Sequence, residues 1–207
     1  MPSPILHLEI LFRLAEDFKC QINPSILLGT ISPDAIHSRP NHTWEDKSVT
    51  HFYDEADQNY EFALQAVTAK TNHLPKDFAL GYKLHLLMDY LWREKVYTPF
   101  FIAYKEKLSR QELHALYYRE MGRLDELILT KSNWIGEART LLSQERPIHD
   151  FTLLTNNEIQ EWCKKVLRED LQIKETECLS ELEIFSEQAI FLFINQTLQV
   201  LKESVLD

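Results

Sequence analysis

The chain has 207 residues, 44% of them hydrophobic and 26% charged, so it can bury a core and is not a disordered protein. Its 32 acidic residues outnumber 22 basic ones, giving a formal net charge of -10, which argues against a role in binding duplex nucleic acid. With only 4 glycines and long segments rich in Leu, Glu, Lys and Gln, the composition excludes most sheet architectures. We expect an all-α bundle with one domain over residues 1–207.

Three features of the sequence bear on its cellular compartment. The first residues, MPSPILHLEILFRLAEDF, lack the basic start of a secretory signal and reach Glu9 early. The most apolar run, AIFLFI around Ile190, is too short to span a bilayer. Cys20, Cys163 and Cys178 are widely spaced and form no CxxC motif, which is typical of reduced cysteines. We expect a cytoplasmic protein without a transmembrane segment.

The first predicted helix covers Ile5–Phe18, with apolar residues at helical spacing. His7 lies on its first turn beside the apolar face, and taken alone it is expected at the surface. From Ile22 to Val49 the chain is punctuated by Pro, Ser and Asn, and we expect a long loop interrupted by a short helix at Pro24–Gly29.

This loop concentrates polar groups that can do chemistry. Asp34 follows Pro33, which favours a turn that fixes the direction of the carboxylate. The alternative is that Asp34 only caps a short helical turn. His37 and Arg39 follow closely and could grip a phosphate, or form an ordinary salt bridge in solvent.

Two further helices carry the remaining polar candidates. A helix is predicted from Thr50 to about Lys70, with His51 at its N-terminus and acidic residues in its first turns. The next, Phe78–Val96, has an apolar pattern that is interrupted by His85 and Asp89. Their i, i+4 spacing puts both side chains on one helical face, where they could share a hydrogen bond or grip one ion.

The second half of the chain is expected to be helical scaffold, with a homodimer surface left open. Pro99 restarts a helix, and a capping-box signature at Thr155–Glu158 begins a later one. His149-Asp150 resembles the dipeptide of metal phosphohydrolases but lacks helical partners at the right spacing. The other predicted helices are Arg110–Leu129, Trp134–Ser143 and Cys178–Val205.

Five polar residues in the first 89 form a candidate metal site. Three histidines and two carboxylates are donors that zinc accepts, at about 2.0–2.2 Å. They are His7, Asp34, His51, His85 and Asp89.

The segments around these residues resemble the zinc-dependent phospholipase C family, whose helical fold is shared with the P1-type nucleases. The resemblance rests on the N-terminal His, G-T-I-S-P-D-A-I-H, T-H-F and G-Y-K-L-H-L-L-M-D, within roughly the first 95 residues. It implies that Asp34, His51, His85 and Asp89 bind one ion. It also implies that Asp89 bridges to a second ion bound by His7, and that Asp34 doubles as the base that orients water.

Two departures from the family change the number of metal ions that the resemblance implies. Met1-Pro2-Ser3 precedes the His, where the secreted enzymes begin with a metal-binding Trp. The family's H-x-x-x-E pair is absent, because Tyr118 follows His114 and Leu153 follows His149 at that distance; Glu94 is a substitute that the sequence leaves open. We therefore expect one or two ions, zinc first, with Mn²⁺, Ni²⁺ or Fe²⁺ as alternatives.

The expected function is hydrolysis of a small phosphoester by a metal-activated water. Asp34 is the expected catalytic residue, and His37 and Arg39 are the expected substrate-binding residues. One alternative is a nuclease or nucleotidase acting on short single strands. Another is a non-catalytic helical protein that the metal stabilises, because structural zinc sites are closed by four protein ligands whereas catalytic sites keep an open position.

Overall fold

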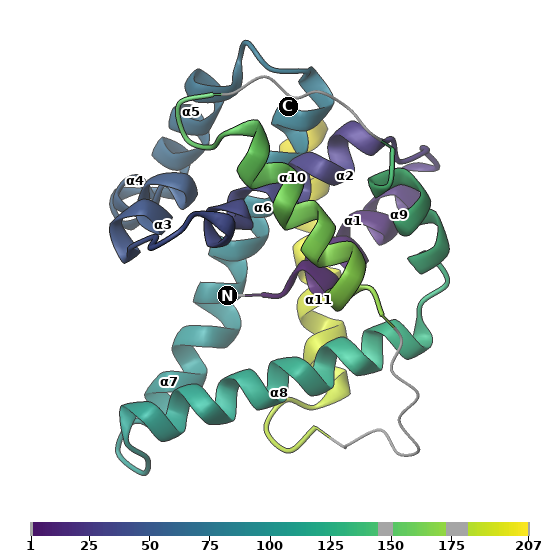
Figure 1. The fold of residues 1–207 in the computed structure, drawn as a ribbon. Helices are drawn as coiled ribbons and strands as arrows, with labels where there is room; N and C mark the ends of the chain where they lie inside the picture. The colour runs from purple at the N-terminus through teal and green to yellow at the C-terminus, as the bar shows by residue number, and fades with distance from the viewer. Residues whose placement is uncertain (1, 145–150, 173–181, 207) are drawn as a thin grey trace.

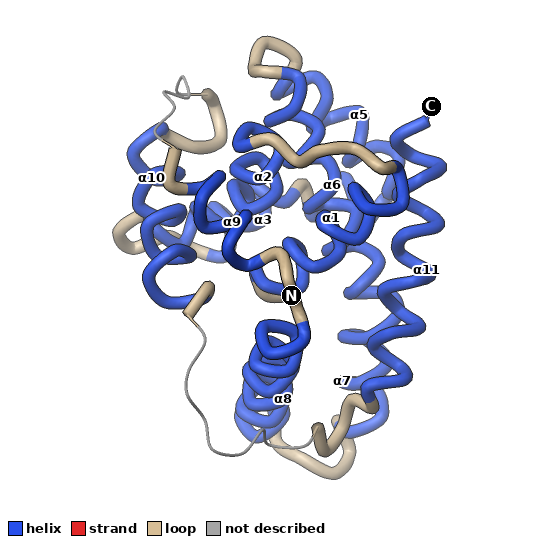
Figure 2. Tube along the Cα trace, turned by 90° about the vertical axis from the view of Figure 1, so that its right-hand side faces the viewer, coloured by secondary structure: helices blue, strands red, loops and turns tan. Residues whose placement is uncertain are grey.

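The computed structural model describes residues 2–144, 151–172 and 182–206, and within them every regular element is helical. Figure 1 shows the helices arranged around α6, with α8 lying across one end and α11 passing behind. In Figure 2, turned by 90°, α8 and α11 extend from the body that the shorter helices form. The prediction of an all-α fold is confirmed. The elements are α1 (Pro4–Phe18), α2 (Pro24–Ile31), the 3-10 helix η1 (Ser32–Ser38), α3 (Trp44–His51), α4 (Tyr53–Gln58), α5 (Tyr60–Thr71), α6 (Lys76–Trp92), the π-helical turn η2 (Arg93–Tyr97), α7 (Thr98–Tyr104), α8 (Arg110–Lys131), α9 (Ile135–Leu142), α10 (Asn156–Lys165), the π-helical turn η3 (Val166–Asp170) and α11 (Glu187–Leu206).

Local capping explains where several helices begin. The Ser3 side chain accepts a hydrogen bond from the Leu6 amide, and Pro4 occupies the first turn of α1. α10 begins with a reciprocal capping box between Thr155 and Glu158, as the sequence predicts. An equivalent box between Ser109 and Glu112 begins α8.

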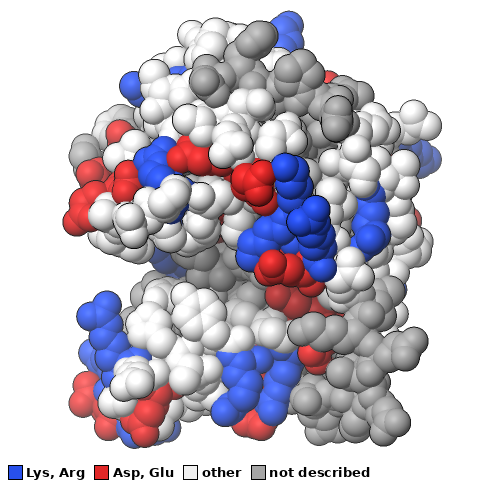
Figure 3. All heavy atoms as spheres, viewed as in Figure 1, with Lys and Arg blue, Asp and Glu red and all other residues white. Residues whose placement is uncertain are grey.

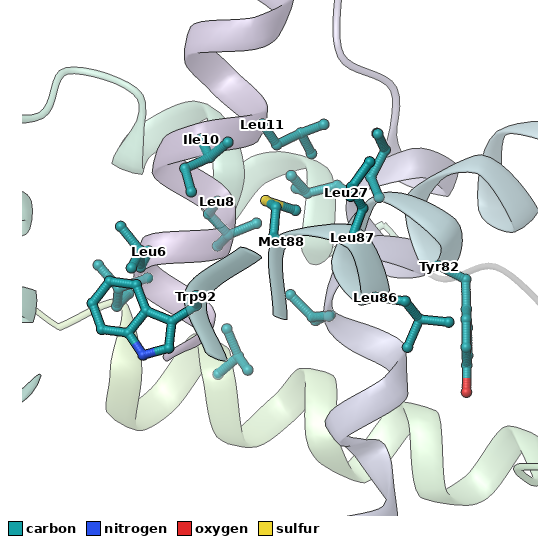
Figure 4. Packing of buried hydrophobic residues seen from close by; sticks show 14 of the residues in the cluster. Leu6, Leu8, Ile10, Leu11, Leu27, Tyr82, Leu86, Leu87, Met88 and Trp92 are labelled. Atoms are coloured by element: carbon teal, nitrogen blue, oxygen red, sulfur yellow. The ribbon is translucent and has the colours of Figure 1, made fainter. Parts of the chain in front are cut away.

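Helix α6 forms the centre of the hydrophobic core and packs most closely against α2. Figure 4 shows side chains of α6, including Leu87 and Met88, packed among those of α1 and α2. Two glycines allow the close approach. A Cβ on Gly29 would lie 2.2 Å from the Phe78 carbonyl oxygen, and one on Gly81 would lie 2.1 Å from the Ile26 carbonyl oxygen. The two helices therefore touch backbone to backbone.

The short helix predicted at Pro24–Gly29 is confirmed as α2, but most of the loop predicted around it over residues 22–49 is wrong. η1 and α3 occupy much of it, and α3 begins with a capping box between Thr43 and Asp46. The prediction that one helix runs from Thr50 to Lys70 is also wrong. His51 ends α3 rather than beginning a helix, because Phe52 adopts a left-handed conformation (φ 52°) that breaks the chain into α3 and α4.

The second half of the described chain differs from expectation mainly at its ends. The helix predicted from Cys178 begins only at Glu187 within the described residues. Glu120 of α8 is fully buried, and its Oε2 accepts hydrogen bonds from the amides of Glu183, Ile184 and Phe185. These bonds fix the segment before α11. The His149-Asp150 dipeptide and Cys178 lie outside the described residues.

Among the described residues, no helix combines the length and the apolar character that crossing a bilayer requires.

Candidate metal centre

The structure brings together all five residues that the sequence nominates as metal ligands. They come from four elements in the first half of the chain: α1, η1, α3 and α6. Each is at least 94% buried, and the prediction of a surface position for His7 is wrong. Residues Ile5–Leu11 of α1 are all buried, so this turn has no solvent side for His7 to face. The exposed fractions are 1% for His7, 6% for Asp34, 3% for His51, 0% for His85 and 4% for Asp89.

Asp89 lies at the centre of the cluster and contacts all three histidines. Its Oδ1 lies 3.2 Å from Nε2 of His7. Its Oδ2 lies 3.6 Å from Nε2 of His51 and 3.6 Å from Nε2 of His85. The two oxygens of this one carboxylate thus face three imidazoles between them.

Asp34 joins the cluster through His51, with its Oδ1 3.3 Å from His51 Nε2. Two groups of donor atoms result, one from His7, His85 and Asp89 and the other from Asp34, His51 and His85. Within each group the donor atoms lie within 4.8 Å of one another. The rings of His7 and His85 also stack, with centroids 4.0 Å apart.

The donor atoms that face the centre have no hydrogen-bond partner. This holds for Nε2 of His7, His51 and His85 and for both oxygens of Asp89, because their contacts reach ion-pair distance without hydrogen-bond geometry. Buried polar atoms are rarely left unpaired. A cluster of five such atoms converging on one volume fits a bound cation.

Two of the histidines are oriented through their other ring nitrogen. His85 Nδ1 lies 2.8 Å from the Thr30 carbonyl oxygen, in the last turn of α2, where carbonyls lack helical partners. His51 Nδ1 lies 3.1 Å from the Lys47 carbonyl oxygen. An Nδ1–H donated to a carbonyl leaves the Nε2 lone pair pointing at the centre, which is the arrangement of metal-bound histidines.

The electrostatics of the cluster favour the protonation states that bind metals. Burial, followed by repulsion from His85, lowers the pKa of His7 to about 4, and burial lowers the pKa of His51. Burial opposes charge on Asp34 and Asp89, yet Lys47 holds the pKa of Asp34 well below its usual range and His85 does the same for Asp89. Burial also opposes charge on His85, but the Asp89 carboxylate raises its pKa. The surroundings therefore favour ionised carboxylates on Asp34 and Asp89 and neutral imidazoles on His7 and His51, whereas His85 is protonated more readily and has to release its proton to bind a metal.

The two predicted substrate-binding residues have different surroundings. His37 is partly exposed, and its Nε2 lies 3.7 Å from Asp34 Oδ1. Arg39 instead binds α10, with Nε 2.6 Å from Glu158 Oε1, and it also donates to Asp46 at 2.8 Å. Its guanidinium is occupied by these partners, so it joins η1 to α10. Glu94, the open candidate for a further ligand, is exposed on η2.

Sequence reasoning missed three residues that shape the site. Lys47 Nζ lies 3.4 Å from Asp34 Oδ1, and Thr30 supplies the carbonyl that orients His85. Tyr53 packs its ring 5.3 Å from that of His51, and burial together with Asp89 and Asp34 raises the pKa of its phenol. The capping pair Thr43 and Asp46 is the sequence signal that indicates α3. A helix there places Lys47 and His51 at i, i+4 spacing, on one face.

A cavity of about 1120 Å³ lies on another side of the molecule, among α1, α8, α9 and α11. Glu9, Phe12, Trp134 and Phe191 are among its lining residues, and none of the five clustered residues lines it. Glu9 is already paired there with Arg13 and Trp134. The cavity is therefore separate from the candidate metal centre.

Comparison of the chain with protein-family models, with curated proteins and with solved structures found no match.

Proposed function

We propose that this protein is a metal-dependent hydrolase of a phosphoester, with zinc as the first candidate metal. The observation that carries the proposal is the convergence of unpaired donor atoms from His7, His51, His85 and Asp89 on one buried centre. Three imidazoles and two carboxylates suit zinc, and Mn²⁺, Ni²⁺ and Fe²⁺ accept the same donors.

The donor set divides naturally between two ions. A ring nitrogen has one lone pair and serves one ion, so His85 cannot belong to both donor groups at once. The two oxygens of Asp89 face different histidines, Oδ1 toward His7 and Oδ2 toward His51 and His85. We assign Asp34, His51, His85 and Asp89 to one ion, and His7 with the other Asp89 oxygen to a second, which is the division that the phospholipase C resemblance implies.

A divalent cation in this centre supplies Lewis acidity, which acidifies a water molecule and polarises a phosphoryl oxygen. The chain's own contribution is to hold that water and accept its proton. Asp34 is the residue for this role, because Lys47 keeps its carboxylate ionised despite burial. His85 and His51 stay fixed through Nδ1, so their Nε2 atoms need no reorganisation during the reaction.

We propose phosphoesters as substrates because of the motif resemblance. We propose a hydrolase rather than a closed structural site because the donor atoms are shared between two ions. Under that division, His7 and one Asp89 oxygen are the ligands that the described residues would offer to the second ion. Structural zinc sites have four protein ligands, whereas a site with fewer leaves positions for water and substrate.

The first test is metal content followed by activity. The chelator-treated wild type, reloaded with zinc, should hold about one or two equivalents by elemental analysis, and the double variant His85→Ala, Asp89→Ala should hold none. His73→Ala, at an exposed turn, is the matched control and should keep the metal.

The loaded protein should hydrolyse at least one of a nitrophenyl phosphodiester, a glycerophospholipid and a dinucleotide. Preference for the dinucleotide would favour the nuclease alternative. Bound metal with no activity on any phosphoester would favour the non-catalytic alternative, and no bound metal in the wild type would refute the proposal.

A further inference from the structure

The ammonium group of Lys47 contacts the candidate metal centre. It extends from α3 to lie 3.4 Å from Asp34 Oδ1 and 3.2 Å from His37 Nε2. The Lys47 side chain is only 13% exposed, so the ammonium is drawn toward the cluster rather than into solvent. The same residue orients His51 through its carbonyl oxygen.

Arg39 and His37, two other basic side chains near Lys47, are already engaged elsewhere. The guanidinium of Arg39 is held by Glu158, Asp46 and the Leu153 carbonyl. Both ring nitrogens of His37 already face other side chains. The His37 ring accepts from Lys47 at Nε2 and faces His42 at Nδ1, 3.1 Å away.

The ammonium of Lys47 has a donor to spare. It carries three N–H bonds, and Asp34 and His37 engage two of them. The third can donate to a group that approaches the centre from the partly exposed side of His37. Figure 3 shows that the molecule is hollowed on the face that it presents, between the part that carries α3 and α10 and the part that carries α8.

The charge of the centre indicates what that group is. Histidines bind a metal in their neutral form, so a metal-binding cluster counts two carboxylates and one ammonium and has a net charge of minus one before the ion is added. One divalent ion makes it net positive by one charge, and a second ion makes it more so. On the surrounding face, acidic and basic side chains are interspersed, so the positive charge is confined to the centre.

We propose that Lys47 is a specificity-determining residue that holds an anionic oxygen of the substrate, so that the centre prefers a charged phosphoester to a neutral ester. This inference rests on the proposed function. The phosphoryl group would be bound on one side by the ion beside Asp34 and on the other by the ammonium, which is a common phosphate donor.

The test compares zinc-loaded wild type with Lys47→Met, Lys47→Arg and Lys70→Met. Lys70 is exposed on α5, so Lys70→Met makes the same change of charge away from the site. The probes are inorganic phosphate, bis(4-nitrophenyl) phosphate and the neutral ester 4-nitrophenyl acetate. Calorimetry gives the Kd for phosphate, kinetics give kcat and KM, and elemental analysis gives the zinc content.

We expect Lys47→Met to keep its zinc and to raise the Kd for phosphate at least tenfold. Its kcat/KM should fall at least tenfold for the phosphodiester and less than threefold for the neutral ester. Lys47→Arg should recover much of the loss, and Lys70→Met should resemble wild type.

Equal phosphate affinity in wild type and Lys47→Met, with zinc retained, would refute the role of Lys47 and leave the proposed function standing. Loss of zinc from Lys47→Met would also refute it, because Lys47 would then support the ligand Asp34 only. A wild type without zinc would refute both proposals.

Discussion

Substitution of Asp89 by Asn separates a metal centre from a buried hydrogen-bonded cluster. Asn has the same shape but lacks the charge, and Asp89 is the one residue that faces all three histidines. In a metal centre, the change removes a charged ligand and weakens zinc binding. Loss of an outer-shell partner alone lowers affinity by about 10- to 100-fold, so about 100-fold is a lower expectation for a ligand.

The expected effect on stability follows from mass action. Zinc at about 1,000 times its Kd stabilises the wild type by about 4.1 kcal/mol, and a 100-fold weaker variant at the same zinc concentration gains about 1.4 kcal/mol. The difference of about 2.7 kcal/mol corresponds to about 5–11 °C in Tm for a chain of this size. Thermal unfolding with and without zinc, followed by circular dichroism, measures both shifts.

The control is Asp125→Asn on α8. Asp125 is a half-buried carboxyl that accepts a hydrogen bond from Ser3, and burial raises its pKa to about 7, so at neutral pH the substitution removes less charge than Asp89→Asn does. It should keep the full zinc-dependent shift. Equal shifts in wild type and Asp89→Asn would refute the metal-centre reasoning.

Three further predictions concern pH, packing and the Arg39 network. Burial lowers the pKa of His7 from 6.5 to about 4, so between these values the unfolded chain binds a proton that the folded chain does not. The metal-free protein should therefore lose up to about 3 kcal/mol as pH falls from 6.5 to 4, and His7→Gln should lose measurably less in denaturant titrations at pH 7 and 4.5. Gly81→Ala should lower the free energy of unfolding by at least about 3 kcal/mol, because its Cβ would meet the Ile26 carbonyl, whereas Gly122→Ala, with open space around it, should stabilise α8 by up to about 1 kcal/mol in urea denaturation. Arg39→Ala should lower stability by about 1–2 kcal/mol through loss of the contacts to α10, with unchanged zinc affinity by calorimetry; a loss of zinc affinity would place Arg39 at the centre instead.

The sequence predicts best those elements whose own residues determine them. α1, α8 and α10 have apolar stripes or capping boxes, and their predicted positions agree with the structure to within a few residues. α3 was missed because only Thr50 and His51 of its eight residues are buried. A helix without an apolar stripe depends on its cap and on its neighbours, which no pattern within its own sequence reveals.

The candidate site likewise has residues that the sequence reveals and relations that only the packed structure reveals. His85 and Asp89 are visible in the sequence because they interrupt an apolar helix, and the motif resemblance adds Asp34 and His51. The burial of His7 depends on what covers α1 from every side, and the donation from His85 to Thr30 depends on the docking of α2 on α6. Such relations exist only once separate segments have packed.

The glycine contact between α2 and α6 should make the candidate metal centre tolerant of mutation elsewhere. A spacing set by side chains changes whenever a rotamer or a residue changes, whereas the contact of Gly29 and Gly81 with opposing carbonyls involves no rotatable groups. Substitutions of nearby Leu27 or Leu87 can then alter stability while the distance between Thr30 and His85 stays constant. The two glycines allow the surrounding core to diverge in sequence without loss of the imidazole's position.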